Sequence, residues 1–88
     1  MEERKGLGKY IKIHIIMVEI FRTNVKDKRT AGKVLKALQA HLPTFRFNFD
    51  LEDCDRILRA QSNGCPVECT KIMQIVKGHS IEISLFED

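Results

Sequence analysis

TFRFNFDLEDCDRILRAQ, residues 44–61, is the stretch that decides the fold, because it predicts two β-strands joined by a short polar connection. In its first part three phenylalanines alternate strictly with polar residues, which is typical of a strand with one apolar face. Its last part, DRILRAQ, is a second strand that places Leu58 and Ala60 inward. Between the strands lies an acidic run, 50–55, whose aspartates can supply turn hydrogen bonds from their own side chains. The stretch therefore predicts an antiparallel β-hairpin.

The segment upstream of the hairpin predicts a strand followed by a helix. Residues 11–21, IKIHIIMVEIF, are dense in β-branched side chains. In residues 27–42, DKRTAGKVLKALQAHL, the apolar positions recur at helical spacing, which indicates one buried helical face. We expect Asn24 or Asp27 to cap this helix. Pro43 should end it, because proline has no amide hydrogen for the helical ladder.

The segment downstream of the hairpin repeats that order in reverse. Residues 65–78, CPVECTKIMQIVKG, predict a second helix with Cys65 as its cap, Pro66 at its first position and Gly78 at its end. A cysteine at that cap would gain thiolate character from the exposed helix amides. Residues 80–88, SIEISLFED, alternate again and predict a final strand.

The order strand, helix, strand, strand, helix, strand determines the expected fold class. Two helices on one face of a four-stranded antiparallel sheet bury the apolar stripe of each helix and one face of the sheet. Right-handed crossovers then give the α+β, ferredoxin-like βαββαβ arrangement. The predicted core is Ile16, Val18, Ile20, Val34, Leu35, Leu38, Phe45, Phe47, Phe49, Leu58, Ile72, Ile75, Val76, Ile81 and Ile83.

In the first strand Ile16, Val18 and Ile20 alternate with Met17, Glu19 and Phe21, and we assign the β-branched set to the core. The residues between them, Met17, Glu19 and Phe21, then point to the side of the sheet that carries no helix. A mixed apolar and charged surface of this kind suits a weak contact with another protein or with a second copy of the chain. The predicted partner surface is Met17, Glu19, Phe21, Ile57, Arg59, Glu82 and Phe86.

Size and composition set the broad class of protein. The chain has 88 residues, enough for one domain, which we place at 11–88 with a disordered tail at 1–10. Its net charge of +3 is too small to indicate nucleic-acid binding by itself. No apolar run approaches the ~20 residues that span a membrane. Three cysteines cannot form a complete set of internal disulfides, which favours a reducing compartment, and we predict a cytoplasmic protein.

Candidate metal ligands are few and separated. A calcium loop needs ligands over about twelve residues with a central glycine, which the run 50–55 lacks. The predicted fold places Cys54 and His79 at one end of the sheet and Cys65 and Cys69 at the other, a strand length of roughly 17–20 Å away. Neither end completes the four ligands of a structural zinc site. We therefore expect no metal and no other cofactor, and these four residues remain weak candidates.

The quoted segments together resemble a known family. LPTFRFNFDLEDCDRILRA followed by CPVECTKIMQIVKGHSIEISLFED is similar to the heavy-metal-associated domains of copper chaperones and metal-transport ATPases, over residues 17–88. The shared pattern is a helix ending in Leu-Pro, a strand, a short acidic hairpin, a strand, a helix and an acidic-edged last strand. That family binds metal through Met-x-Cys-x-x-Cys after the first strand, whereas residues 20–28, IFRTNVKDK, contain no cysteine, histidine or methionine. The resemblance thus implies a divergent member with the family's fold and weak docking to similar domains.

These observations predict a small non-enzymatic binding or interaction domain. One alternative is a weak metal-binding or metallochaperone-like protein that uses Cys54 or the pair Cys65 and Cys69. A second alternative is a nucleic-acid-binding module that uses the basic first helix. We weigh that alternative lower, because a charged run on a helix is commonly just its solvated face. Its residues are Lys26, Lys28, Arg29, Lys33 and Lys36.

Overall fold

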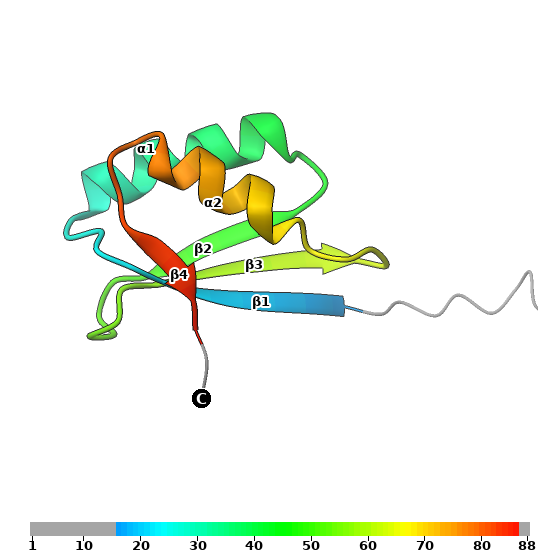
Figure 1. Cartoon of the computed structure of the whole chain (residues 1–88), viewed down its shortest axis with the longest axis horizontal. Helices are drawn as coiled ribbons and strands as arrows, with labels where there is room; N and C mark the ends of the chain where they lie inside the picture. The colour runs from blue at the N-terminus through cyan, green and yellow to red at the C-terminus, as the bar shows by residue number, and fades with distance from the viewer. Residues whose placement is uncertain (1–15, 87–88) are drawn as a thin grey trace, which may run out of the picture.

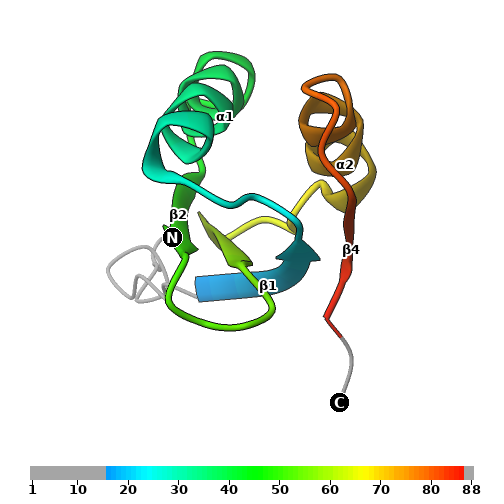
Figure 2. The same cartoon turned by 90° about the vertical axis from the view of Figure 1, so that its left-hand side faces the viewer.

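The computed structural model describes residues 16–86 and confirms the expected fold class. Its elements are β1 Ile16–Thr23, α1 Lys28–His41, β2 Arg46–Asp50, β3 Ile57–Asn63, α2 Cys69–Lys77 and β4 Ile83–Leu85. The strands form one antiparallel sheet in the order β2-β3-β1-β4. Both helices lie on the same face of this sheet, and the other face carries none (Figures 1 and 2). This is the ferredoxin-like βαββαβ fold. The predicted tail at 1–10 lies outside the described residues.

The acidic run forms the hairpin turn between β2 and β3. The Asp50 carboxylate accepts a hydrogen bond from the amide of Glu52 at 3.2 Å, and Asp53 accepts one from the amide of Asp55 at 2.8 Å. The backbone carbonyl of Asp53 also accepts from the amide of Arg56, which adopts a left-handed conformation with φ of 47°. The acidic residues therefore stabilise the turn, as their chemistry predicts.

The first helix begins and ends where its sequence predicts. Asp27 caps α1, because its carboxylate accepts the amide hydrogen of Thr30 at 2.7 Å. Those backbone and side-chain hydrogen bonds from Thr30 lower the pKa of Asp27. The helix ends at His41, and Leu42 forms its C-cap directly before Pro43.

The second helix begins later than predicted. α2 starts at Cys69, with Glu68 as an N-cap that makes no side-chain hydrogen bond, so the assignment of Cys65 as cap is wrong. The buried hydroxyl of Ser62 donates to the carbonyl of Cys65 as the chain leaves β3. This contact fixes the chain in a non-helical path over residues 64–68. The predicted end is confirmed, since Gly78 is the C-cap.

The register of β1 is the reverse of the prediction. Phe21 is fully buried and lies opposite Leu58, so it faces the helices. Ile16 and Val18 lie at even positions on the other face and are 58% and 44% exposed, so placing them and Ile20 in the core is wrong. β4 pairs only with the Phe21–Thr23 end of β1.

Neither helix in residues 16–86 is long and apolar enough to cross a membrane.

The rest of the core follows the prediction closely. The predicted core residues found buried are Val34, Leu38, Phe45, Leu58, Ile72, Val76, Ile81 and Ile83. The predicted core residues found packed against this core but partly exposed are Leu35, Phe47, Phe49 and Ile75. Ala60 is buried, as its predicted inward direction requires, and the core also contains Phe21, Val25, Ala31 and Leu42.

Candidate functional site: the open face of the sheet

The side of the sheet without helices is formed by alternate residues of all four strands, and we call it the open face. Directly opposed residues in antiparallel strands point to the same face. Because Phe21 and Leu58 face the helices, their neighbours along each strand face away from them. The open face therefore consists of Ile16, Val18, Ile20, Arg22, Arg46, Asn48, Asp50, Ile57, Arg59, Gln61, Asn63, Ser84 and Phe86.

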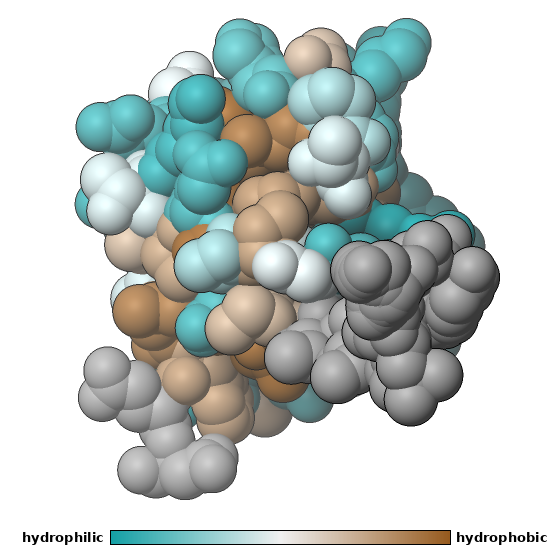
Figure 3. Space-filling view, turned by 90° about the vertical axis from the view of Figure 1, so that its right-hand side faces the viewer, coloured by the Kyte–Doolittle hydropathy of each residue, from teal (hydrophilic) through white to brown (hydrophobic). Residues whose placement is uncertain are grey.

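The apolar part of the open face runs along β1. Ile16 and Val18 are the most exposed large hydrophobic residues in the described chain, and Ile20 and Phe86 beside them are half-buried. Figure 3 views the end of the molecule at which β1 begins, and hydrophobic residues reach the surface in the lower half of that view, around the strands. A β-branched stripe left in contact with water is a feature of docking surfaces.

One aromatic side chain on this face is held by an arginine. The Arg22 guanidinium lies over the Phe86 ring, 4.7 Å from its centroid. The same arginine forms an ion pair with Asp55, with Nε 3.6 Å from a carboxylate oxygen. A cation over an aromatic face is attracted by the ring quadrupole. The two contacts orient both Arg22 and Phe86 along the edge of the open face.

Three residues of the predicted partner surface lie on the opposite side of the sheet. Phe21 is in the core, and Met17 and Glu19 share its face because they alternate with the open-face residues of β1. Glu19 also acts electrostatically on Cys69 of α2, which places its carboxylate on the helix side. Including Met17, Glu19 and Phe21 in an open-face surface was therefore wrong.

The other four predicted residues are distributed over the open face and its rim. Ile57 belongs to the open face but is only 6% exposed, so it offers a partner almost no surface. Arg59 is half-buried and donates from Nη1 to the side-chain oxygen of Asn48 at 3.3 Å. Phe86 is half-buried against Arg22. Glu82 is exposed at the rim, just before β4.

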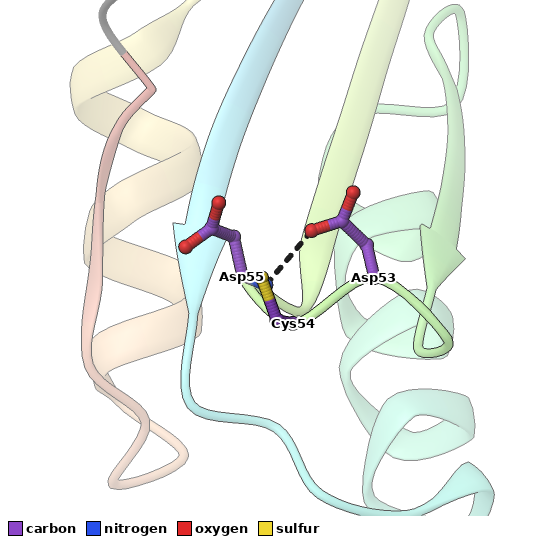
Figure 4. Close-up of side chains that lie close together, drawn as sticks. All are labelled: Asp53, Cys54 and Asp55. Atoms are coloured by element: carbon purple, nitrogen blue, oxygen red, sulfur yellow. Dashed lines mark hydrogen bonds between the residues drawn. The ribbon is translucent and has the colours of Figure 1, made fainter.

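The hairpin turn contains the one group of three metal-ligand side chains in residues 16–86. The ligand atoms of Asp53, Cys54 and Asp55 lie within 4.8 Å of one another. Figure 4 shows the two carboxylates on either side of the thiol, with the hydrogen bond to the Asp53 carboxylate drawn as a dashed line. That carboxylate binds the turn backbone, and Asp55 pairs with Arg22. These contacts make all three side chains part of the structure of the turn.

The three thiols are free and lie at two ends of the sheet. Cys54 precedes β3, whereas Cys65 and Cys69 follow it. Within the described chain, no group of three ligands includes Cys65, Cys69 or His79. Cys65 is exposed, with its sulfur 4.0 Å from the carbonyl oxygen of Asn63. Burial, and then the negative charge of Glu19, raise the pKa of Cys69, which disfavours its reactive thiolate.

The loop after β1, where the resembled family holds its metal, is closed by protein hydrogen bonds. The amide of Asn24 donates to the carbonyl of Glu82 at 3.3 Å, and the amide of Glu82 donates to the Asn24 side chain at 3.0 Å. Thr23 adds a hydroxyl hydrogen bond to the carbonyl of Arg56 at 2.6 Å. Hydrogen bonds thus join the loop to the residue that precedes β4 and to the residue that precedes β3.

The basic residues of α1 and of the loop before it are all exposed: Lys26, Lys28, Arg29, Lys33 and Lys36.

Comparison with known proteins gives no match: no family model, no curated protein and no solved structure is significantly similar to this chain. The candidate site therefore rests on its own geometry.

Proposed function

We propose that this chain is a non-enzymatic protein-interaction domain that docks a partner protein through the open face. The observation that carries the proposal is the exposure of Ile16 and Val18, at 58% and 44%, on a sheet face that no helix covers. Burying such side chains against a partner releases about 25 cal/mol for each Å² of apolar surface removed from water. This gain drives most protein–protein association.

The charges around the apolar stripe indicate the chemistry of the partner. Among the described strand residues, Arg22, Arg46 and Arg59 lie on the open face together with one carboxylate, that of Asp50. Arg22 also pairs with Asp55 of the hairpin turn, which leaves Arg46 and Arg59 as the main positive charges on this face. Arginine is enriched at interfaces because its planar guanidinium binds carboxylates through two hydrogen bonds while its stem covers apolar surface. The complementary partner surface has an apolar centre and an acidic rim.

The fold supports a relationship to heavy-metal-associated domains, whose architecture is also βαββαβ. In this proposal the chain is a cytoplasmic, divergent relative that has no metal ligands in the loop after β1. Without metal ligands, the property of that family that this chain retains in the proposal is docking to another protein.

A photoreactive amino acid placed at position 18 tests the proposal. The matched control places it at Lys33, an exposed position of α1 away from the open face. We expect a discrete adduct from position 18 in cells, lost when Arg59 is changed to Glu. The purified adduct partner should then bind the wild-type domain, and Val18→Asp should weaken that binding at least about tenfold, as loss of an interface anchor does.

Two results would contradict the proposal. One is equal labelling from positions 18 and 33, and the other is binding of the purified partner that Val18→Asp leaves unchanged. Thermal unfolding of each variant establishes that the fold is intact. Binding of mixed oligonucleotides that falls steeply with salt would instead favour the basic face of α1.

A further inference from the structure

The outer edge of β2 carries backbone groups that no described residue pairs. Phe86 donates its amide to the carbonyl of Ile20, so Ile20 directs its backbone groups to β4 and Phe21 directs them to β3. The backbone N–H and C=O groups of Leu58, which lies opposite Phe21, are therefore directed to β1. Phe49 lies opposite Leu58 on the β2 side, so its backbone groups are directed away from β3, toward the free edge of the sheet. By the same alternation the backbone groups of Phe47 are also directed toward the free edge.

Both ends of this edge are closed by hydrogen bonds. At the start, the amide of Phe45 donates to Leu42 at 3.1 Å, and the Gln39 side chain donates to the Phe45 carbonyl at 3.0 Å. At the other end, the Arg56 guanidinium donates to the carbonyl of Leu51 at 3.1 Å. Within residues 16–86, the outward N–H and C=O groups of Phe47 and Phe49 remain without a strand partner. Such an edge is a template for pairing with another strand.

The sequence of β2, RFNFD, is complementary to itself in antiparallel register. A two-fold axis at Asn48 places Arg46 opposite Asp50 of the second copy at both ends of the pairing. It also places Phe47 opposite Phe49 of the second copy, so that the four outward groups of each copy form hydrogen bonds with those of the other. We propose that β2 pairs in this way with β2 of a second copy, giving an eight-stranded antiparallel sheet.

The groove beside the edge fits this occupant. A hollow of about 440 Å³ lies between α1 and β2, lined by Ala31, Gly32, Leu35, Phe49 and Leu51 among others. Gly32 is exposed, and apart from its two neighbours and the backbone of its own helix no atom lies within 4 Å of where its Cβ would be. In the paired sheet, Phe47 and Phe49 of the second copy lie on the helix side, next to this hollow. The aromatic side chains then lose contact with water in both copies.

This interface is separate from the apolar stripe of the proposed function, which lies on β1. Its paired segment has five residues, which is small for an interface, so we expect the dimer to be weak. Residues 16 and 18 lie two strands away and stay accessible in the dimer.

Charge reversal at the two ends of β2 tests the register. Arg46→Asp alone places aspartate opposite aspartate, and Asp50→Arg alone places arginine opposite arginine. We expect each single variant to be monomeric in sedimentation from about 1 to about 300 µM, where weak interfaces dissociate. An equimolar mixture of the two should form a heterodimer, and the double variant should recover the homodimer. Lys33→Asp and Glu68→Arg, at exposed positions of α1 and before α2, are the charge-matched controls and should dimerise like the wild type.

Three outcomes would overturn the proposal. They are a wild-type protein that stays monomeric throughout this range, single variants that dimerise as well as the wild type, and a mixture that does not associate. A dimer that Val18→Asp disrupts and charge reversal does not would place self-association on the open face instead. Unfolding curves of each variant confirm that the substitutions at these exposed positions leave the domain folded.

Discussion

Two substitutions in β1, three residues apart, test the register of the sheet. Phe21 is fully buried under the helices, so Phe21→Ala removes a large core side chain and leaves a cavity. Such changes cost about 3–5 kcal/mol. Val18 lies on the open face at 44% exposure, and Val18→Thr retains the β-branched shape. Its expected cost is within about 0.5 kcal/mol, as for surface positions.

Urea unfolding followed by circular dichroism measures both free energies. At an m-value of about 1–2 kcal/mol per M, Phe21→Ala should lower the midpoint by at least about 1.5 M, while Val18→Thr should move it by at most about 0.5 M. In the register that the β-branched pattern predicts, Val18 would be in the core and Phe21 at the surface. A larger cost at position 18 than at position 21 would therefore refute the packing described for β1, because a one-residue slip exchanges the two faces of a strand.

Further outcomes follow from other residues. Leu38→Ala should cost about 2–5 kcal/mol in the same unfolding experiment, because Leu38 is fully buried; a cost under about 0.5 kcal/mol would place it at the surface. The lowered pKa of Asp27 stabilises the fold at pH values above 3.8, its unfolded value, and this stabilisation is lost as the pH falls through the folded pKa. The melting temperatures of wild type and Asp27→Asn should therefore converge as the pH falls further below 3.8, and a constant difference would contradict this. A disulfide reagent should modify Cys69 more slowly than Cys54 and Cys65, because burial raises the pKa of the Cys69 thiol. The rates are compared in variants that each keep a single cysteine, and fastest labelling of Cys69 would contradict the prediction. Titration with Zn²⁺ or Cu⁺ under reducing conditions should show no stoichiometric complex against a competing chelator, whereas a 1:1 complex of submicromolar affinity would restore the metallochaperone alternative.

The fold follows from the sequence because most segments have only one periodicity. In β2 the phenylalanines alternate with polar residues, so the buried face is unambiguous. α1 has one apolar stripe, an aspartate at its start and a proline beyond its end. Where the local pattern, the cap and the tertiary packing agree, residue chemistry alone places the element.

The open face was harder to predict because β1 is apolar on both sides. Ile16, Val18 and Ile20 alternate with Met17, Glu19 and Phe21, and β-branched residues suit a strand on either face. What decides the register is the volume that Phe21 fills opposite Leu58 under the helices, which is a tertiary property. A useful signal is size, since a phenylalanine at the centre of the sheet buries more apolar surface than a valine.

The start of α2 differs from the sequence prediction for another reason. Cys65-Pro66 is a good local signal for a helix start, but the Ser62 hydroxyl holds the Cys65 carbonyl in the path by which the chain leaves β3. A serine at the end of a strand gives no sign in the sequence of which carbonyl it will bind. The error matters for chemistry, because the expected thiolate character of Cys65 depended on its position as helix cap.

The position of Glu19 has a consequence for strand addition at the edge of β1. β4 covers only the last part of β1, so the edge of β1 at residues 16–19 has no strand partner on that side among the described residues. An extra strand added there would bury the Glu19 carboxylate between itself and α2, and an unpaired buried charge is costly. Inward-pointing charges of this kind protect sheet edges from unwanted strand addition. The opposite edge, at β2, places two phenylalanines on the helix side where β1 has its glutamate. The charge at the β1 edge thus disfavours strand addition there, whereas over residues 46–50 the β2 edge has no charged side chain on its helix side.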